Sequence, residues 1–543
     1  MKLSGAQAIV KALELEGVDV VFGYPGAAIC PFYDALLESN IRHILTRHEQ
    51  GAAHAASGYA RTTGKTGVCI ATSGPGATNL ITGIADAYMD STPLVAITGQ
   101  VSSELIGRDV FQEADITGAT DPFCKHNYLV KNTEDLPHIL KEAFYIASTG
   151  RPGPVLIDVP IDIQTRDIDF EYPQKVDIRG YKPNYKGHSL QIKKIAEAIA
   201  EAKRPVICAG GGVVNSDASK ELLELVQKCG IPVVTTMMGI GSIPYDHELN
   251  FGMLGSHGVY TANYAVHNAD LLIIMGARVA DRAIGNPDGI AQRAKIVHID
   301  IDPAEIGKNI EVYIPVVGDI KRVLKELAAI ARKGDADQWR RTIEEKKEEH
   351  PLKVTDIKNG TGYVNPKYVL RVLTDLLGED DIVTTEVGQN QIWSANYMGI
   401  RKPRKFITSG GLGTMGYGFP AAIGAKIGCP GSKVVCISGD GSFQMTMQEM
   451  GTIKQNQLGV KVLLFNNSRL GMVRELQKLK YGCRYSQVFL DENPDFIKLF
   501  DAYGFRGRRI DDNSQVEEAL KEMLSDDSVY LLECRVDPEE STL

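Results

Sequence analysis

Short apolar runs rich in valine and isoleucine alternate along the whole chain with segments of helical period. Strand-like runs include VCIATSG at 68–74, VVCISGD at 434–440 and VKVLLFNN at 460–467, and SKELLELVQKC at 219–229 has a helical pattern. This alternation is typical of βαβ units with buried parallel strands. Since one domain usually holds roughly 100–200 residues, a chain of 543 residues is predicted to form several α/β domains.

Two polar, charge-rich stretches interrupt the alternation, at 164–190 and 333–362. We interpret them as linkers or surface connections, because neither shows apolar periodicity. They divide the chain into three predicted doubly wound α/β domains with parallel sheets, at 1–165, 188–333 and 362–543. The first and third share a pattern, ATSGPGATN at 71–79 and CISGDGSFQ at 436–444, in which a strand ends in a glycine-flanked turn and enters a helix. The shared pattern hints at a duplicated fold.

Composition and charge argue against several classes of protein. A net charge of −9, with no basic run interleaved with aromatic residues, argues against nucleic-acid binding. No apolar run approaches the ~18–20 residues that span a bilayer, and Glu14 and Glu16 interrupt the segment where a signal peptide would be apolar. The nine cysteines never form a CxxC pair, so neither a disulfide framework nor a zinc site is indicated. We therefore expect a cytoplasmic protein without membrane or nucleic-acid partners.

The most specific chemical pattern is Gly439-Asp440-Gly441, followed after 24 residues by Asn466-Asn467. The runs 433–438 and 460–466 are predicted strands joined through a helix at 445–456, and a right-handed crossover would bring Asp440 and Asn467 together at neighbouring strand ends. A carboxylate and an amide oxygen suit Mg²⁺, and the glycines let a diphosphate approach the backbone. The alternative for GDG alone is an ordinary strand-to-helix turn.

This spacing of GDG and NN resembles the signature of thiamine-diphosphate (ThDP) enzymes. The resemblance implies that Asp440, Asn467 and the backbone carbonyl of Arg469 ligate the metal. It also implies that Met415, in SGGLGTMGYGFPAAIG, wedges beneath the cofactor; a gap-filling core methionine is the alternative. The other residues that the resemblance assigns to ThDP are Gly388, Gln389, Asn390, Gly413, Gly439, Gly441, Ser442, Gly471 and Met472.

Glu49 is the predicted catalytic carboxylate. ThDP reacts only after its C2 proton is removed, which requires a carboxylic acid to protonate N1′ of its pyrimidine. Glu49 follows the apolar run Ile41–Leu45 and opens an alanine-rich helix in ILTRHEQGAAHAASGYARTTG, which resembles the RHEQ motif of the family. The alternative is a carboxylate that merely favours a helix N-terminus. His48 and His54 are assigned no role.

Within the ThDP enzymes, the stretch 106–131 resembles a loop of the acetohydroxyacid (acetolactate) synthase family. By this resemblance Phe111 and Gln112 line the substrate pocket, Lys125 lies near its entrance, and Gln112 and Lys125 assist the substrate. Phe111 as a core residue and Lys125 as a solvated charge are the alternatives. Leu476, in GMVRELQKLKY, stands where biosynthetic members carry tryptophan in the pocket for the second substrate. This difference bears on the choice between 2-oxobutyrate and pyruvate.

The middle domain contains glycine-rich turns typical of a dinucleotide site. Gly210-Gly211-Gly212 follows an apolar strand, and Asp300 ends another, where it could accept a ribose hydroxyl. A glycine triplet alone occurs in many turns. Together with segments 252–286 and 295–309, these turns are similar to the FAD-binding domain of the same family. The resemblance assigns to FAD the residues Arg151, Gly210, Gly211, Gly212, Met253, Leu254, Gly255, Gly276, Arg278, Arg282, Asp300, Ile301 and Asp319.

The resemblance covers roughly residues 1–536 and implies a carboligase. Such an enzyme decarboxylates pyruvate and transfers the hydroxyethyl unit to a second 2-oxo acid, giving 2-acetolactate or 2-aceto-2-hydroxybutyrate, the first common step of branched-chain amino-acid biosynthesis. ThDP, Mg²⁺ and FAD as cofactors and a homodimer or homotetramer are also implied, and a small regulatory subunit is left open. The alternatives are another ThDP-dependent ligase or oxidase, of the pyruvate oxidase or sulfoacetaldehyde acetyltransferase type, and a regulatory homologue that binds cofactors without activity.

Other positions depart from the family pattern. Asn390 replaces a histidine beside the cofactor, and Ser102 and Arg108 replace a proline and a threonine near the pocket mouth, where an added arginine favours another anionic substrate. The sequence ends at DPEESTL, where relatives continue into a segment that helps to close the site. We therefore expect weaker ligation, or closure by another part of the protein.

Overall fold

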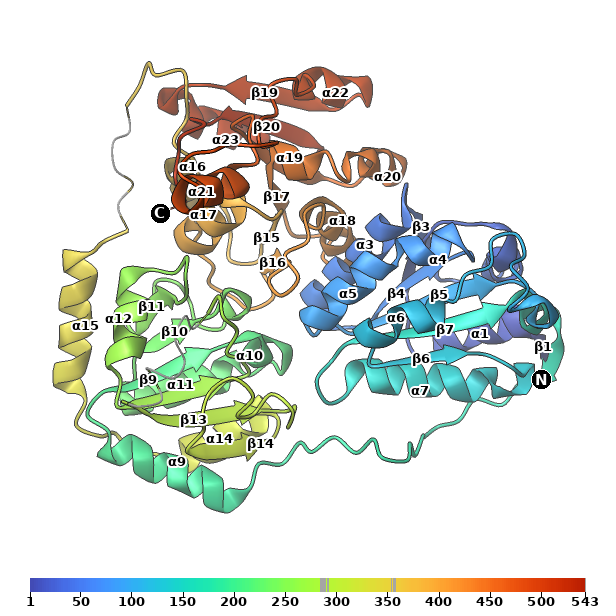
Figure 1. The fold of residues 1–543 in the computed structure, drawn as a ribbon, viewed down its shortest axis with the longest axis horizontal. Coiled ribbons are helices and arrows are strands. Elements are labelled where there is room, and N and C mark those ends of the chain that lie inside the picture. The colour runs from blue at the N-terminus through green and yellow to red at the C-terminus, as the bar shows by residue number, and fades with distance from the viewer. Residues whose placement is uncertain (284–289, 291–292, 353, 355–357, 543) are drawn as a thin grey trace.

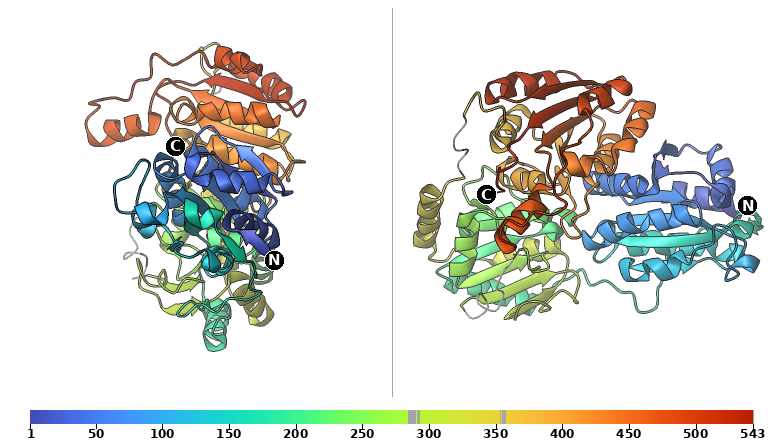
Figure 2. Two further views of the ribbon diagram at one scale, coloured as in Figure 1. Left: turned by 90° about the vertical axis from the view of Figure 1, so that its right-hand side faces the viewer. Right: turned by 45° about the horizontal axis from the view of Figure 1, so that its top comes forward.

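The computed structural model describes residues 1–283, 290, 293–352, 354 and 358–542. This part of the chain contains three α/β units, each built around a six-stranded parallel sheet, as the sequence predicts. In Figure 1 the N-terminal unit lies at the right, the middle unit at the lower left and the C-terminal unit at the top, and Figure 2 shows the same units from two other sides. None of the described helices is long and apolar enough to cross a membrane.

The N-terminal sheet has the strand order β3-β2-β4-β5-β7-β6. Strands such as β4 and β5 are buried along their whole length because helices cover both faces, which explains their continuous apolar sequences. Helix α3 starts at Glu49, after His48 caps it by accepting from the Gln50 backbone, and ends at Thr63, which is followed by Gly64 in the left-handed region. The strands are β2 (Val20–Gly23), β3 (Arg42–Leu45), β4 (Gly67–Ala71), β5 (Leu94–Gln100), β6 (His126–Leu129) and β7 (Pro154–Pro160). The helices are α1 (Gly5–Leu15), α2 (Cys30–Leu36), α3 (Glu49–Thr63), α4 (Pro75–Asn79), α5 (Ile81–Met89), α6 (Ile116–Thr120), α7 (Leu136–Ser148) and α8 (Ile161–Thr165).

The C-terminal sheet repeats the topology of the N-terminal one. Its order is β16-β15-β17-β18-β20-β19, so in both sheets the strands, counted along the chain, are arranged 2-1-3-4-6-5. This agreement supports the duplicated fold. The expected helix at 445–456 is split into a 3-10 turn, Met447–Glu449, and α20 (Met450–Asn456). The strands are β15 (Ile382–Thr385), β16 (Phe406–Thr408), β17 (Val434–Gly439), β18 (Val460–Asn466), β19 (Arg506–Ile510) and β20 (Tyr530–Arg535). The other helices are α16 (Pro366–Leu376), α17 (Gln389–Tyr397), α18 (Gly418–Gly428), α19 (Asp440–Phe443), α21 (Gly471–Lys480), α22 (Phe496–Ala502) and α23 (Val516–Met523).

The middle sheet has a different order, β11-β10-β9-β12-β13-β14. Counted along the chain this is 3-2-1-4-5-6, the order of dinucleotide-binding folds, in which the ligand crevice opens where the winding reverses, here between β9 and β12. The strands are β9 (Pro205–Ala209), β10 (Val233–Thr235), β11 (Asn250–Met253), β12 (Leu271–Met275), β13 (Lys295–Asp300) and β14 (Ile314–Val317). The helices described by bounds are α9 (Ser189–Glu201), α10 (Gly211–Asn215), α11 (Ser219–Cys229), α12 (Tyr260–Asn268), α14 (Ile320–Ile330) and α15 (Asp337–Glu349).

The N- and C-terminal units share one hydrophobic core, in which α3 packs closely on α18. A side chain at Gly58 would overlap the backbone of Ala421, and one at Gly424 would overlap the carbonyl of Ala55. The Ser57 and Tyr417 hydroxyls lie 3.1 Å apart across the same contact. Glycine on each helix therefore lets the two backbones approach.

The two charge-rich stretches are only partly linkers. In the first, β8 (Asp167–Asp169) pairs antiparallel with β1 (Lys2–Ser4), and the chain then runs along the lower edge of the molecule (Figure 1). In the second, the prediction of a linker is wrong for α15, a helix whose Trp339 and Ile343 are buried. Trp339 stacks on Tyr264 of α12, with ring centroids 6.1 Å apart. Two apolar residues spaced i, i+4 thus fix a helix that is otherwise charged. The exact domain boundaries stay a prediction.

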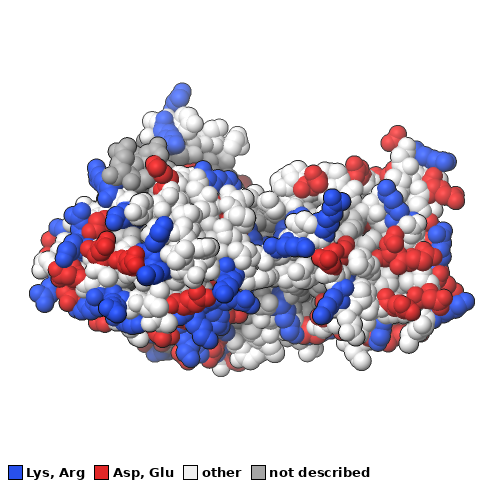
Figure 3. Space-filling model, turned by 90° about the horizontal axis from the view of Figure 1, so that it is seen from below, with Lys and Arg blue, Asp and Glu red and all other residues white. Residues whose placement is uncertain are grey.

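Charges of both signs are interspersed over the face drawn in Figure 3. Charged side chains of the described chain form short-range pairs, such as Lys203 with Asp335 and Lys141 with Glu16. An interspersed surface gives no concentrated positive field to attract a polyanion to this face.

Candidate functional site

The predicted metal ligands lie at neighbouring strand ends, as expected. Strand β17 pairs in parallel with β18, with Gly439 opposite Phe465, so Asp440 and Asn467 both follow the carboxyl ends of these strands. Both side chains are buried. They line a small cavity together with Arg469, Met415 and the glycines at 388, 439, 441 and 471. Among the described residues no group of three His, Cys, Asp or Glu could hold a metal, so any ion here depends on this mixed oxygen set.

Two helix N-termini open onto the same cavity. Gly388 caps α17 with a φ of 141°, and α21 begins at Gly471. Free backbone N–H groups at helix N-termini attract phosphate, and both helices exceed two turns. Gly471 has no room for a side chain because a Cβ there would overlap the side-chain amides of Gln389 and Asn467. The predicted ThDP residues Gly388, Gln389, Asn390, Met415, Gly439, Asp440, Gly441, Ser442, Asn467, Gly471 and Met472 all line this cavity, whereas Gly413 lines the larger one next to it.

Asp440 is oriented by a residue that the sequence did not single out. Asn493 Nδ2 donates to Asp440 Oδ2 at 2.6 Å, and Gln444 Nε2 donates both to Asn493 Oδ1 at 2.9 Å and to the Asp440 carbonyl at 3.0 Å. Burial raises the pKa of Asp440 to about 6, which the Asn493 hydrogen bond partly opposes. A cation at this point would remove the cost of burying the charge.

Asn467 is held in a similar way. Its Nδ2 donates to Gln389 Oε1 at 3.0 Å, and Gln389 Nε2 donates to the carbonyl of Glu540 at 2.9 Å. The Trp393 indole donates to the carbonyl of Ser541. The segment around 540 therefore lies against the predicted ThDP residues and supports Gln389.

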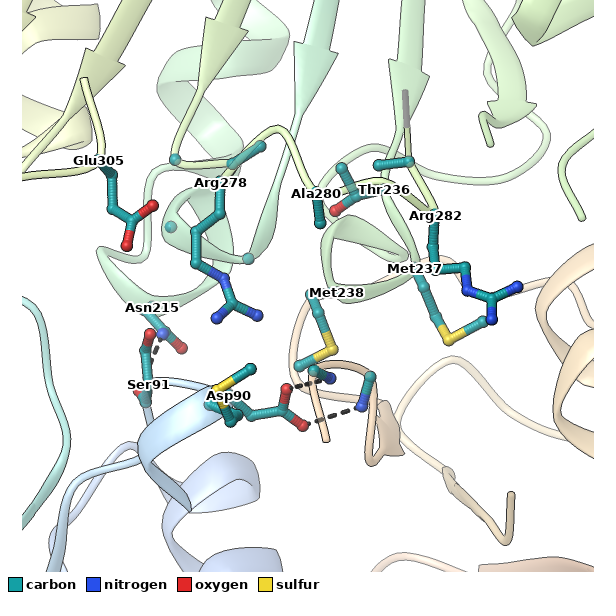
Figure 4. Close-up of a pocket in the computed structure, with 18 of the residues that line it drawn as sticks. Asp90, Ser91, Asn215, Thr236, Met237, Met238, Arg278, Ala280, Arg282 and Glu305 are labelled. Atoms are coloured by element: carbon teal, nitrogen blue, oxygen red, sulfur yellow. Dashed lines mark hydrogen bonds between the residues drawn. The ribbon is translucent and has the colours of Figure 1, made fainter. Parts of the chain in front are cut away.

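The loop that carries Met415 is fixed by buried carboxylates from both units. Glu386 accepts from the backbone of Gly416 at 2.7 Å and of Phe419 at 3.0 Å, and burial raises its pKa to about 7. From the N-terminal unit, Asp90 accepts from the backbone of Gly410 at 3.0 Å and Gly411 at 2.7 Å, as Figure 4 shows. The Asp90 contacts therefore tie the loop that carries Met415 to the end of α5 in the N-terminal unit.

Glu49 opens α3, as predicted, and its side chain is buried. Asn79 Nδ2 donates to Glu49 Oε2 at 2.9 Å, and Gly76 leaves room for the other carboxylate oxygen. Within the described chain, Glu49 is absent from the lining of both cavities. The single chain thus keeps its predicted carboxylate and its predicted diphosphate site apart. His48 and His54 are structural, since His48 caps α3 and His54 is fully buried with its pKa lowered by burial to about 3.

The predicted substrate residues do not gather at one place in the chain. Gln112, at a φ of 58°, has its backbone against Gly74, and Phe111 beside it is 86% exposed. The Lys125 ammonium donates to the carbonyls of Ile146 and Thr149 and to the Tyr181 hydroxyl, at the carboxyl end of α7. Burial lowers the pKa of Lys125 to about 7. These contacts are those of a helix cap, and a substrate role for Lys125 stays a prediction.

Helix α21 carries Leu476 and projects from the C-terminal unit (Figure 2, left). Arg474 is buried on its inner face and pairs with Glu539, whereas Leu476 is 45% exposed. Leu476 and Phe111 therefore both face away from the interior of the single chain.

The larger cavity, of about 590 Å³, lies at the switch point of the middle sheet and reaches the C-terminal unit. Gly212 and Gly276 touch backbone to backbone, with Gly276 at a φ of 59°, so only glycine fits there. Gly388 and Met472 line both cavities, so the two adjoin. The predicted FAD residues in its lining are Arg151, Gly211, Gly212, Met253, Leu254, Gly276, Arg278, Arg282, Asp300, Ile301 and Asp319, whereas Gly210 and Gly255 lie just outside it.

The arginines of this cavity differ in their surroundings. Arg151 pairs with Glu305 at 2.8 Å and with Asp302 at 3.4 Å. Arg282 is largely exposed. Arg278 extends into the cavity toward Asp90 (Figure 4), and burial lowers the pKa of its guanidinium. Arg278 is thus the side chain best placed to meet an anionic group.

Comparison with known proteins agrees with this geometry. Three family models match the chain: the N-terminal TPP binding domain of thiamine pyrophosphate enzymes at residues 3–119, their central domain at 192–327 and their C-terminal TPP binding domain at 386–534. A protein of Methanocaldococcus jannaschii named probable acetolactate synthase large subunit is 52% identical, over 99% of this chain and 93% of its own length. The acetolactate synthase of Mycobacterium bovis is 48% identical over 96% and 86%, and the acetolactate synthase large subunit of Buchnera aphidicola is 45% identical over 99% and 95%.

The chain belongs to the thiamine pyrophosphate enzymes, in the acetolactate synthase family.

In a thiamine pyrophosphate enzyme the residues found here fit the cofactor. The glycine cradle and two helix N-termini suit its diphosphate, and the oxygens of Asp440 and Asn467 suit a hard cation. Three residues that support this candidate site were not predicted from the sequence: Asn79, Asn493 and Glu386. Asn79 ends the segment ATSGPGATN, and Glu386 precedes the predicted ThDP residue Gly388 by two positions, so their polar character close to glycine was the available signal. Asn493 lies in a loop without a pattern of its own.

Proposed function

We propose that this protein decarboxylates pyruvate and joins the resulting two-carbon unit to a second 2-oxo acid, giving 2-acetolactate. The observation that carries the proposal is the position of Asp440 and Asn467 at the carboxyl ends of the neighbouring strands β17 and β18. They line one cavity with glycines that leave room for a diphosphate, and their oxygens suit Mg²⁺. The names of the relatives supply the reaction class. Bound ThDP supplies a carbon nucleophile that attacks the 2-oxo group.

In this proposal the side chains and backbone groups of the site divide the binding of the cofactor and the metal among them. Asp440, Asn467 and the Arg469 carbonyl hold Mg²⁺, the helix N-termini at Gly388 and Gly471 hold the diphosphate, and Met415 fixes the shape of the cofactor. Glu49 supplies the proton at the pyrimidine nitrogen, and Asn79 keeps its carboxyl group in one orientation.

We infer that the larger cavity takes FAD. Its support is the 3-2-1-4-5-6 strand order, the glycine contact at Gly212 and Gly276, and the buried carboxylate of Asp300 at the end of β13. Burial raises the pKa of Asp300 to about 6, so a hydrogen bond from a ribose hydroxyl would stabilise its charged form.

A second copy of the chain completes the site in this proposal. Glu49 is absent from the lining of both cavities in the described chain, and Phe111 and Leu476 are exposed. A homodimer, or a homotetramer built from it, would bring Glu49 and Phe111 of one copy to the cofactor of the other. A small regulatory subunit stays an open addition.

The test is a product assay. Purified protein with ThDP, Mg²⁺, FAD and pyruvate should form acetolactate, detected as acetoin after acid treatment. Acetaldehyde alone, or hydrogen peroxide with oxygen uptake, would instead identify a decarboxylase or an oxidase.

A further inference from the structure

Glu449 is a fully buried carboxylate of the C-terminal unit that binds the N-terminal unit. It ends the 3-10 segment Met447–Glu449, which follows strand β17 and helix α19 along the chain. The Arg47 backbone N–H donates to Glu449 Oε1 at 3.0 Å and to Oε2 at 3.2 Å, and the Thr452 hydroxyl donates to Oε2 at 2.6 Å. Burial raises the pKa of Glu449 to about 7, and hydrogen bonds from Thr452 and from the backbone of Arg47 and His48 oppose the shift.

The hydrogen bond to Glu449 is one of several contacts that hold the segment 45–48 against α20 and the turn before it. The Arg47 guanidinium donates to the carbonyl of Gly451 at 3.0 Å and to Gln455 Oε1 at 2.9 Å, and the Thr452 hydroxyl also reaches the Leu45 carbonyl at 3.2 Å. Every one of these contacts joins α20 or the turn before it to the end of β3. Among the described groups that shift the pKa of Glu449, the charged one is the Arg47 guanidinium.

The segment 45–48 is followed directly by Glu49. Arg47 and His48 precede it, and Gly51 in the first turn of α3 has no room for a side chain because a Cβ there would lie 2.5 Å from Glu449 Oε1. The start of α3 is thus pressed against the Glu449 carboxylate, and any shift of that carboxylate moves the backbone that carries Glu49.

We propose that Glu449 is a positioning residue for Glu49: its carboxylate fixes the backbone at Arg47 and His48 and thereby the place from which Glu49 reaches the cofactor. This inference rests on the proposed role of Glu49. An apolar residue would fill the same space without the cost of a buried charge, but it would leave the N–H groups of Arg47 and His48 without this acceptor. A displacement of about 1 Å in such a group lowers turnover by about 100-fold.

The first measurement needs no cofactor. Hydrogen exchange of the segment 44–53 is compared in the full-length wild-type protein and in Glu449→Gln, which keeps the shape but has only one oxygen to accept. We expect the amides of Arg47 and His48 to exchange at least ten times faster in the variant. Asp158→Asn, which alters another buried carboxylate, bonded to Thr98 and Gln100, should leave exchange of this segment unchanged.

The second measurement uses the holoenzyme. Glu449→Gln should lower kcat by about 10- to 100-fold, with the KM for pyruvate and the dissociation constant of ThDP changed less than twofold. Exchange of the cofactor's C2 proton with deuterated water, measured without substrate, should slow by the same factor as kcat. Thr452→Val, which removes one donor to Glu449, should show a smaller change in the same direction and serves if Glu449→Gln does not fold.

The outcomes separate this inference from the proposed function. If Glu49→Gln retains full turnover, the role of Glu49 is wrong and the positioning role of Glu449 falls with it, whereas the reaction itself is tested by the acetolactate assay. If Glu49→Gln is inactive but Glu449→Gln and Thr452→Val keep wild-type amide exchange and kcat, only the positioning role is overturned. A fall in ThDP affinity that accounts for the whole loss of rate would also overturn it, because Glu449 would then act on cofactor binding.

Discussion

The side-chain amide of Asn493 lies 2.6 Å from Asp440 Oδ2 and donates to it, while Gln444 holds the other end of the same amide. Because Gln444 donates to Asn493 Oδ1, the Asn493 nitrogen must face Asp440. The carboxylate also accepts hydrogen bonds from the backbone of Gly441 and Ser468, so its orientation beside the cavity is fixed from two sides. A loop that begins beyond α21 thus completes the surroundings of a residue at the end of β17.

Asn493→Leu should weaken Mg²⁺ binding. The variant keeps the branched shape of the side chain but removes the donor, and loss of a hydrogen bond to a metal ligand typically costs about 10- to 100-fold in affinity. The measurement is a Mg²⁺ titration of ThDP binding, followed by protein fluorescence. Glu492→Ala, an exposed neighbour in the same loop, is the matched control and should bind Mg²⁺ as the wild type does. Equal affinity in Asn493→Leu would show that Asp440 is oriented without Asn493.

The sequence was sufficient for the parts of the site that lie within one βαβ unit. GDG and NN stand at the ends of two apolar runs, and the parallel register of β17 and β18 brings Asp440 and Asn467 together. The same local logic placed Glu49 at the start of α3. In each case the strand or helix next to the residue fixes its position, so pattern and spacing were informative.

Contacts between distant segments were not predictable in this way. Glu449 binds Arg47, and Asp90 binds Gly410, across hundreds of residues of sequence. The sequence around one residue of each pair contains no pattern that indicates its partner. Strand order was also outside the reach of periodicity, because apolar runs indicate a strand but not its neighbours. Helix α15 was missed for a third reason, since only Trp339 and Ile343 reveal its buried face within a charged stretch.

Gly58→Ala should destabilise the contact between the N- and C-terminal units. The new methyl group would overlap the Ala421 carbonyl and lie 2.7 Å from its Cα. Overpacking of this kind costs about 1–3 kcal/mol, which outweighs the roughly 0.5–1 kcal/mol that alanine gains over glycine within a helix. The midpoint of thermal unfolding should therefore fall.

Gly431→Ala is the control for this change, because nothing lies within 4 Å of the added Cβ. Its unfolding midpoint should stay close to that of the wild type. A Gly58→Ala protein that is as stable as the Gly431→Ala protein would mean that α3 and α18 can separate without loss.

His54 should make the protein less stable as the pH falls. Burial lowers the pKa of His54 to about 3 in the folded chain, whereas an unfolded histidine titrates near about 6.5. Because the folded-state pKa is lowered, the contribution of His54 to the free energy of unfolding has its full value above about pH 6.5. Below that pH it falls progressively, by about 1.4 kcal/mol per pH unit.

The measurement compares wild type with His54→Gln in denaturant at pH 7.5, 6.0 and 5.0. Glutamine does not titrate, so the difference in unfolding free energy between the two proteins should shift in favour of the variant as the pH falls. A difference that stays constant over this range would show that the ring takes up a proton without leaving its site beside Gln50 and Tyr417.

Leu476→Trp should shift the choice of the second substrate toward 2-oxobutyrate. Leu476 is 45% exposed on the outer face of α21, where the family resemblance places a tryptophan. A larger apolar surface gains contact with the extra methylene of 2-oxobutyrate, for which a complete pocket discriminates by about 10- to 200-fold and a half-open one by less. With equal pyruvate and 2-oxobutyrate, the ratio of 2-aceto-2-hydroxybutyrate to 2-acetolactate should rise several-fold. Leu479→Trp, on the same helix but 81% exposed, should leave the ratio unchanged, and an equal rise in both variants would place the second substrate elsewhere.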